Sequence, residues 1–506
     1  MNIISLGNTP VSFTQYEADG RRVVVAAGSR AVVFSWEGSH LRSAPVMLKD
    51  ITAVTTLNTE NYPNSLMLAT DFGISIGRVR SLEKMHIRST SLGLHTPRHI
   101  VHEPTHRVFG VGTVYTEPCR VGEEEKTMNS LKLLDDTTLE VLAQAELQQD
   151  EQIMSLAVLQ HLLCVGTFSL RLDETEPTSG KILLFEVQHA SSTLIQLKRV
   201  AATDVGGCVY SLVVIDGLLA AAINSSVSLY RVSSITEDLS PSTPSYTIHS
   251  MMEWNHNYMV TSLSAYRNHL VVADQFSSVS LLRLEEEDGD DDGDGDDDDG
   301  GNRKLVTVAR DYSPLWPVCV EAVDEKSFIG ADQSLNMFTF SLSGSTTNNR
   351  TILVRDGFYH VGDLITKFIR GSLATTTDSA PGRFKSTHIF CTLSGQIGVI
   401  TSVENDIVLS RFLSALELQL GQKSISAGGV SHAKHRAPRL SRGRSDADSA
   451  AYGILDGDLL EQMLTYMNTD PELAEEIYTL SVADDDDLPY TLAELKKDLE
   501  LLQNMH

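Results

Sequence analysis

The stretch LLAAAINSSVSLY, from Leu218 to Tyr230, decides the fold of this chain. An apolar run leads into a polar turn at Asn224 and Ser225, and a second run with β-branched and aromatic residues follows the turn. Such residues on both sides of a short polar turn are typical of a β-hairpin. The stretch therefore predicts two antiparallel strands joined at this turn.

The same thirteen-residue pattern recurs along most of the chain. Close copies begin at Val23, Leu66, Leu270, Phe328 and Ile389, and looser copies begin near Val108 and Leu162. Successive starts lie 42 to 61 residues apart. Hairpins repeated at such a period indicate a β-propeller, whose blades of about four strands stack around a central channel. The alternative is a series of unrelated hairpins in a sandwich or barrel, which the regular spacing disfavours.

One position inside the repeat always holds a residue with a small side chain. The fourth residue of the six close copies is alanine or threonine: Ala26, Ala69, Ala221, Ala273, Ala331 and Thr392. A small side chain at one fixed place predicts strands that crowd toward a common axis.

The composition limits the class of protein. The chain has 506 residues, enough for two or three domains, and 42% of them are hydrophobic. No apolar run is long enough to span a membrane, and the amino terminus does not resemble a signal peptide. The five cysteines are scattered without a CxxC spacing, which predicts buried thiols in a reducing compartment and neither disulfides nor a zinc site.

The charge is strongly negative, −27, and part of it lies in one acidic run from Glu285 to Asp299. The rest of the chain is still acidic, which disfavours a general surface for nucleic-acid phosphates. The run half-matches a calcium loop, with Asp288, Asp290 and Asp292 at the spacing of the ligands. Strand-like sequences flank it where a calcium loop needs helices, so a solvated loop between two strands is the favoured interpretation.

No motif for catalysis, a cofactor or a metal is found. The chain lacks a GxSxG elbow, a phosphate-binding Walker loop and a GxGxxG after a strand, and its histidines have no metal-ligand spacing. The sequence therefore predicts that the protein is not an enzyme, with a propeller enzyme or a sugar-binding propeller as the remote alternative. A pocket of convergent carboxylates at the channel mouth would favour that alternative.

The pattern changes to helical after about residue 405. Apolar residues at Phe412, Leu413, Leu416, Leu418 and Leu420 predict the first helix. Asp456 or Asp458 could cap a helix that runs to about Met467, Pro471 could begin another, and Thr491 with Glu494 could form a capping box. The basic stretch from Lys434 to Arg444 is either a flexible polar loop or a segment for nuclear import or phosphate contact.

Several long motifs resemble one known family. ARDYSPLW (Ala309–Trp316), FIGADQSLNMFTF (Phe328–Phe340) and GFYHVGDLITKFIRGSL (Gly357–Leu373) resemble the third propeller of the family that contains the large subunit of the damaged-DNA-binding complex. KMHIR (Lys84–Arg88), the segment Val165–Val187 and INSSVSLY (Ile223–Tyr230) agree with it. Residues 428–432 and ILDGDLL (Ile454–Leu460) are similar to its helical carboxyl-terminal domain.

The resemblance implies an all-β fold with a β-propeller of the seven-bladed type. It implies remnant blades of a preceding propeller at residues 1–95, the carboxyl-terminal propeller at 96–404 and a small helical domain at 405–506. Members of the family are roughly twice as long and have three propellers, so the propeller here is expected to be incomplete, with an open edge where amino-terminal strands of the family would pair.

For function, the resemblance implies a non-enzymatic adaptor that presents substrate receptors to a cullin ubiquitin ligase in DNA repair and protein turnover. The implied partners are WD-repeat substrate receptors, with damaged DNA contacted through a receptor and no membrane. A cullin is a doubtful partner for this short chain, because the family contacts it through the second propeller. The implied location is nuclear and also cytoplasmic, and no cofactor is implied.

The resemblance maps the receptor-facing positions to Arg310, Trp316, Tyr230, Met259 and Leu364. Trp316 could instead be core, although prolines on both sides favour a position at the start of a strand. Ser277 and Thr366 stand where the family has arginine and asparagine, so the receptors can differ. The alternative function is a scaffold in mRNA 3′-end processing or splicing, because related families share this domain.

Overall fold

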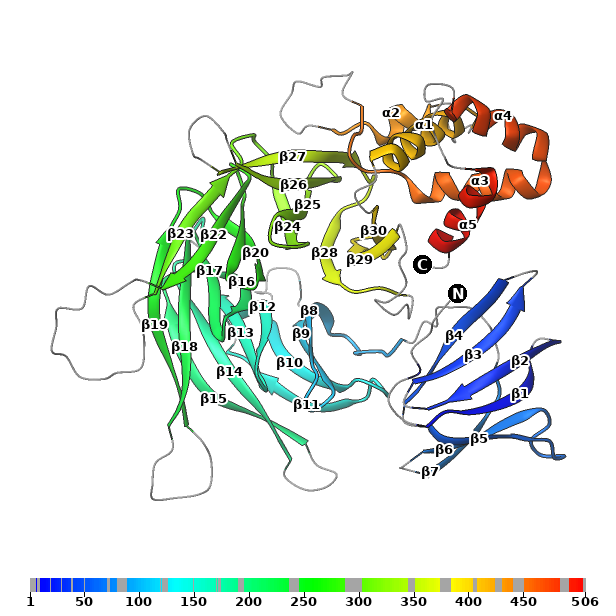
Figure 1. Cartoon of the computed structure of the whole chain (residues 1–506). Coiled ribbons are helices and arrows are strands. Elements are labelled where there is room, and N and C mark those ends of the chain that lie inside the picture. The colour runs from blue at the N-terminus through cyan, green and yellow to red at the C-terminus, as the bar shows by residue number, and fades with distance from the viewer. Residues whose placement is uncertain are drawn as a thin grey trace. The chain divides into compact units, whose positions relative to one another are not determined.

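The structure, a computed structural model, consists of antiparallel sheets followed by helices (Figure 1). No helix in the part of the chain that it describes is long and apolar enough to cross a membrane. The residues described are 6, 10–18, 20–28, 30–37, 40–49, 51–70, 73–79, 89–118, 120, 126–148, 150–169, 171, 174–189, 195–235, 245–286, 303–344, 351–373, 384–403, 407–423, 430–439, 450–482 and 491–503.

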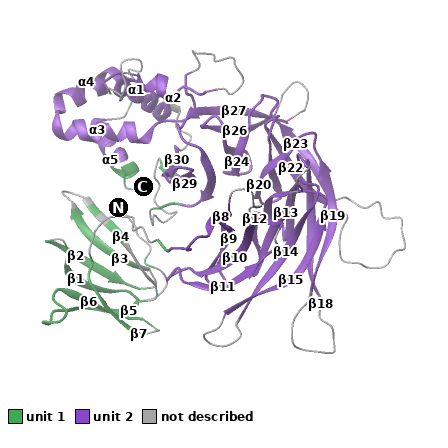
Figure 2. Ribbon diagram, turned by 180° about the vertical axis from the view of Figure 1, so that it is seen from behind, with its two compact units in different colours: residues 1–90, 372–385, 500–506 green, residues 91–371, 386–499 purple. Residues whose placement is uncertain are grey.

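The chain forms two compact units, coloured separately in Figure 2. The first consists of residues 1–90, 372–385 and 500–506, and the second of residues 91–371 and 386–499. The first unit contains a four-stranded and a three-stranded sheet. Their strands are β1 (Ser12–Ala18), β2 (Arg21–Ala27), β3 (Arg30–Glu37) and β4 (His40–Lys49), then β5 (Ile51–Leu57), β6 (Ser65–Thr70) and β7 (Gly73–Gly77).

The second unit is built from six consecutive sheets, each with its strands in sequence order. Five have four strands and the last has three. The strands are β8 (Thr96–Glu103), β9 (Val108–Thr116), β10 (Thr127–Asp135), β11 (Val141–Glu146); β12 (Glu151–Leu159), β13 (Leu162–Ser169), β14 (Gly180–His189), β15 (Ile195–Val205); β16 (Val209–Ile215), β17 (Leu218–Ile223), β18 (Ser226–Ile235), β19 (Ser245–Asn255); β20 (Val260–Tyr266), β21 (His269–Asp274), β22 (Val279–Glu286), β23 (Arg303–Arg310); β24 (Pro317–Ala322), β25 (Ser327–Asp332), β26 (Asn336–Gly344), β27 (Thr351–His360); β28 (Ile365–Arg370), β29 (Phe384–Thr392) and β30 (Ile397–Val403).

All eight hairpins predicted from the sequence are present, and the β-propeller fold is confirmed. Each hairpin supplies the second and third strands of one sheet, as β17 and β18 do for the stretch from Leu218. The polar turn after Ile223 needs a residue that tolerates positive φ, and Asn224 adopts φ 46° there. The Asn224 side chain also accepts a hydrogen bond from the Cys208 backbone N–H at 2.8 Å, which ties the turn to the start of the same blade.

The apolar run of β17 is buried on both faces. Leu219 and Ala221 pack in the core toward β12–β15, while Ala220 and Ala222 pack in the core toward β20–β23. Successive side chains of a strand point to opposite faces, so a blade between two others needs apolar residues at every position. This requirement explains why the repeat reads as a continuous apolar run.

Neighbouring blades of the second unit contact each other through their first strands, β8, β12, β16, β20, β24 and β28 in order. The small residue of the repeat is buried in the second strand beside them: Ala221, Ala273 and Ala331 have at most 1% exposure. A seventh blade does not occur among the described residues of this unit. The domain limits proposed at residues 95 and 404 stay predictions; the second lies between β30 and the first helix.

Among the described residues, five helices follow the sheets: α1 (Ile407–Lys423), α2 (His432–Arg436), α3 (Gly457–Thr469), α4 (Pro471–Val482) and α5 (Leu492–Gln503). Of the two candidate caps, Asp456 is the N-cap of α3 and accepts from the Leu459 N–H, whereas Asp458 lies in the first turn. Thr491 and Glu494 form the predicted capping box of α5.

Leu418 is a correction to the predicted apolar face of α1. It is 55% exposed, whereas Phe412, Leu413, Leu416 and Leu420 are buried. The spacings 412, 413, 416 and 420 follow one face of a helix, and residue 418 falls on the opposite face.

The acidic run belongs to the connection between the third and fourth strands of one blade. Strand β22 continues through Glu285 and Glu286, so these two acids are in the sheet, and Glu286 pairs in register with Arg303 of β23. The calcium-loop pattern lies outside the described residues, as do Lys84–Arg88, Arg442 and Arg444. Residues 287–302 therefore connect two paired strands, β22 and β23.

Replacing residues 287–302 with a short Gly-Ser link is expected to leave the melting temperature within a few degrees. The segment holds no apolar residue to bury, and loop length changes the closure entropy by only about 0.6 kcal/mol per doubling. Calorimetry of the deletion variant beside the full chain measures the difference. Loss of the cooperative transition in the variant would show that the segment is structural, and calcium binding by the full chain alone would restore the calcium-loop interpretation.

Candidate functional site

Three of the five predicted partner-binding residues occupy the same position in successive blades. Met259, Trp316 and Leu364 each stand directly before the first strand of a blade, β20, β24 and β28. Each carbonyl accepts a hydrogen bond from the turn between the second and third strands of its own blade: Gln275 N to Met259 O is 2.9 Å, Gln333 N to Trp316 O is 3.0 Å and Leu393 N to Leu364 O is 2.8 Å. We call the edge that these residues and turns share the rim.

Arg310 belongs to the same rim. It is the last residue of β23, and the fourth strand of a blade ends at the edge where the first strand begins, because all neighbours are antiparallel. Its Nε donates to Ser280 Oγ at 3.1 Å, next to the β21–β22 turn. This hydrogen bond holds the guanidinium at the edge of its blade, beside the start of β22.

Tyr230 does not lie on the rim. Its side chain is 7% exposed and packs in the core with Leu162, Leu184 and Leu219. Burial raises the pKa of its hydroxyl. The structure therefore supports a packing position for Tyr230, and four of the five residues remain as candidates for partner contact.

A continuous series of aromatic rings, which the sequence reasoning missed, runs along this rim. Centroid distances are 5.1 Å from Trp254 to His256, 5.8 Å from His256 to Tyr258, 5.9 Å from Tyr258 to Phe276 and 6.2 Å from Phe276 to Trp316. Tyr258 is 44% and Phe276 42% exposed, and Trp316 is half-buried. We call Tyr258, Phe276 and Trp316 the aromatic shelf. The one local signal was that Tyr258 precedes Met259 and Phe276 lies in a predicted turn.

A buried hydrogen bond positions the shelf. His256 Nε2 lies 2.9 Å from Asp274 Oδ2, and each side chain is 2% exposed. The other oxygen of Asp274 accepts the Phe276 N–H at 2.9 Å, and Ser277 N–H bonds to it as well. His256 follows β19 of one blade and Asp274 ends β21 of the next, so this pair fixes the turn that carries Phe276 against the neighbouring blade.

In the following blade the equivalent turn contacts the helical segment. Asp332 Oδ1 accepts from the Ser334 and Asn336 N–H groups at 2.8 and 3.0 Å. Asn336 forms two hydrogen bonds with the backbone of Arg439. Its Oδ1 accepts from the Arg439 N–H at 3.0 Å, and its Nδ2 donates to the Arg439 carbonyl at 2.6 Å. Burial raises the pKa of the Asp332 carboxyl despite these donors. The segment up to Arg439 therefore lies on the rim beside the turn whose Gln333 bonds to Trp316.

A second buried network fastens the helices to the same blade. Asp456 accepts from His432 Nε2 at 2.9 Å and from Arg436 Nη2 at 2.6 Å. Arg436 also donates to the Val361 carbonyl at 3.2 Å, just after β27, and lies 5.0 Å above the Tyr359 ring. Burial alone would raise the pKa of the Asp456 carboxyl, but the His432 hydrogen bond and the Arg436 charge outweigh it and leave the pKa below its ordinary value.

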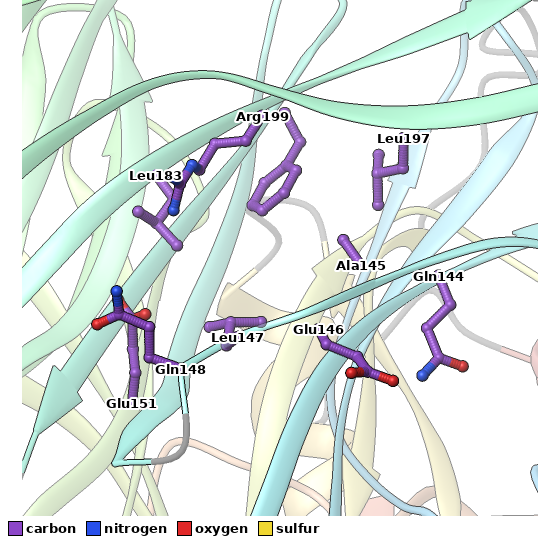
Figure 3. Close-up of a pocket in the computed structure, with 10 residues that line it drawn as sticks. Gln144, Ala145, Glu146, Leu147, Gln148, Glu151, Leu183, Leu197 and Arg199 are labelled. Carbon is purple, nitrogen blue, oxygen red and sulfur yellow. The ribbon is translucent and has the colours of Figure 1, made fainter.

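A pocket of about 470 Å³ lies between β11 and strands β14 and β15 (Figure 3). Leu183, Phe185 and Leu197 form its apolar lining, and Gln144 and Glu146 add polar groups. None of the five predicted residues lines it. Within the described chain, no cluster of three His, Cys, Asp or Glu side chains is arranged to hold a metal ion.

The fold defines the chain as a propeller protein with a helical carboxyl-terminal segment, and comparison with known proteins gives its family. The model of the CPSF A subunit region matches residues 128–465. The chain therefore belongs to the CPSF A subunit region family.

Named relatives agree with this assignment. The chain is 31% identical to DNA damage-binding protein 1 of Solanum lycopersicum over 472 residues and 30% identical to DNA damage-binding protein 1a of Arabidopsis thaliana over the same length. DNA damage-binding protein 1 of Oryza sativa subsp. japonica is 29% identical over 471 residues. Each match covers 91% of this chain and 40% of the relative, so the chain spans about two-fifths of their length.

Proposed function

We propose that this chain is a non-enzymatic scaffold that binds WD-repeat substrate receptors at its rim, as an adaptor-like protein in DNA repair and protein turnover. The observation that carries the proposal is the convergence of Met259, Trp316 and Leu364 at one equivalent position of three successive blades. Partly exposed aromatic and aliphatic side chains held by a rigid backbone are the usual anchors of a protein interface.

The nuclear location and the link to damaged DNA through a receptor belong to this same proposal, and the likeness to DNA damage-binding protein 1 supports them. The proposal places cullin contact in the second propeller of the family rather than in this chain. A scaffold in mRNA 3′-end processing is the second candidate, favoured by the match to the CPSF A subunit region. The two candidates differ in the proteins that should bind the rim.

Co-purification with the tagged 506-residue chain is expected to yield WD-repeat receptors and no cullin. The resemblance assigns cullin contact to a second propeller. At most two sheets of this chain, β1–β4 and β5–β7, correspond to blades of that propeller. Mass spectrometry identifies the captured proteins, and a Met259→Glu/Leu364→Glu variant is the matched control that should lose the receptors. Capture of polyadenylation or splicing factors in place of receptors would favour the second candidate. Stoichiometric capture of a cullin would contradict the expectation that the first unit is too small a part of a propeller to bind it.

A further inference from the structure

Two exposed cations lie in and just after α2, in a chain whose net charge is negative. The net charge of the chain is −27. Lys434 lies in α2, and Arg439 lies three residues after the end of that helix. Both are exposed, and Arg436, between them in the sequence, is half-buried. We call Lys434 and Arg439 the cationic patch. Arg436 is neutralised by Asp456, but in the described part of the chain neither Lys434 nor Arg439 forms an ion pair.

The Arg439 end of the patch is held close to Trp316 of the aromatic shelf. The Arg439 backbone is bonded on both sides to Asn336, and Asn336 closes the turn whose Gln333 donates to the Trp316 carbonyl. Only the four-residue turn 333–336 separates the two attachment points. One extended peptide of a few residues, at about 3.3 Å per residue, can therefore reach both the shelf and Arg439.

Two histidines beside the patch have lowered pKa values, mainly because they are buried and partly because of the nearby arginine charges. The rings of His360 and His435 lie 6.4 Å apart. Burial first, and then the charge of Arg439, lower the pKa of His360 to about 4. Burial and the charge of Arg436 likewise lower the pKa of His435. Both rings are thus neutral at pH 7, and the positive charge of this surface comes from the lysine and arginine side chains.

We propose that the rim binds a protein segment in which an apolar side chain lies on the aromatic shelf and neighbouring carboxylates pair with Lys434 and Arg439. The inference rests on the proposed function and names the chemistry of the partner. Charge complementarity selects carboxylates, and the small number of cations selects a short acidic segment, because the acidic excess of the chain repels a long polyanion. Single-stranded nucleic acid, which could also stack on the rings, would need a continuous cationic groove.

The test selects random peptides displayed on phage against the purified full chain. Peptides enriched by the wild type are expected to combine an apolar anchor with aspartate or glutamate. Peptides selected by a Lys434→Glu/Arg439→Glu variant should still contain the apolar anchor but should no longer be enriched in aspartate and glutamate. Peptides selected by Trp316→Ala should no longer contain the anchor. The matched control is Lys496→Glu/Lys497→Glu, an equal charge reversal at exposed positions of α5 that should select the same peptides as the wild type.

The affinity of the best synthetic peptide, measured by fluorescence anisotropy, should fall about tenfold in the Lys434/Arg439 variant and little in the control. Enriched peptides with an anchor but no acidic preference would overturn the inference and leave the proposed function standing. No anchored peptide at all would overturn both. Binding of a labelled single-stranded oligonucleotide that depends on Arg439, with no acidic peptide selected, would assign the patch to nucleic acid and overturn the inference as well.

Discussion

Replacing Asp456 with alanine is expected to lower the free energy of unfolding of the second unit by about 3–5 kcal/mol. The carboxylate is 7% exposed and is the shared acceptor of His432 and Arg436. Removing one partner of a buried ion pair leaves the other charge desolvated and uncompensated, which is more harmful than losing the pair as a whole. The N-cap of α3 is lost at the same time, since Asp456 also accepts from Leu459.

Chemical denaturation measures this loss, and hydrogen exchange locates it in α2, α3 and the end of β27. Asp458→Ala is the matched control, because Asp458 is exposed in the first turn of the same helix. It should change stability by less than about 1 kcal/mol, through the helix dipole alone. Equal losses in both variants would contradict the assignment of Asp456 as the acceptor that holds the helices to the blade.

The pH dependence of this network has a definite sign. The folded-state pKa of Asp456 lies below its ordinary value, so the unfolded state binds the proton more readily. The stabilisation is fully present above the ordinary carboxyl pKa of about 3.9 and is lost as the pH falls through the lower folded value. In the wild type the helical segment should therefore stay fastened at neutral pH and loosen only below about pH 4, whereas Asp456→Ala should lack this acid transition.

Trp316→Ala is expected to weaken receptor binding by about thirtyfold, or about 2 kcal/mol, and to weaken the fold less than a core tryptophan would. A central interface tryptophan commonly contributes this much to binding. Trp316 is half-buried and precedes Pro317, the first residue of β24, so its truncation leaves the ladder of the sheet intact. A fully buried tryptophan would cost about 3–5 kcal/mol of stability instead.

Both quantities should be measured on one preparation, by chemical denaturation for the fold and by titration with a purified receptor for binding. Tyr312→Ala is the control: Tyr312 is an aromatic in the same connection, 81% exposed and outside the series of ring contacts. It should bind within about twofold of the wild type, which corresponds to a few tenths of a kcal/mol. A Trp316 variant that unfolds several kcal/mol more easily yet binds normally when folded would make Trp316 a core residue.

The sequence by itself determined the repeated hairpins and three helix starts, because these are local structures. A strand, a polar turn and a second strand lie within thirteen residues, and Thr491 meets Glu494 within a single helical turn. Alternation and capping act over such short distances, so residue spacing alone can reveal them. The sequence does not separate Asp456 from Asp458 as the cap, because both lie within two residues of the same helix start.

Only the tertiary structure decided which side chains share the rim. Asn336 and Arg439 are 103 residues apart, and Trp254 meets Thr307 across 53 residues. Tyr230 belongs to the stretch that revealed the fold, yet its face of the strand packs into the core between blades. Connections of varied length separate the blades, so spacing along the chain does not fix which residues of different blades become neighbours. That is set by the stacking of the blades through their first strands, which brings Met259, Trp316 and Leu364 to one edge.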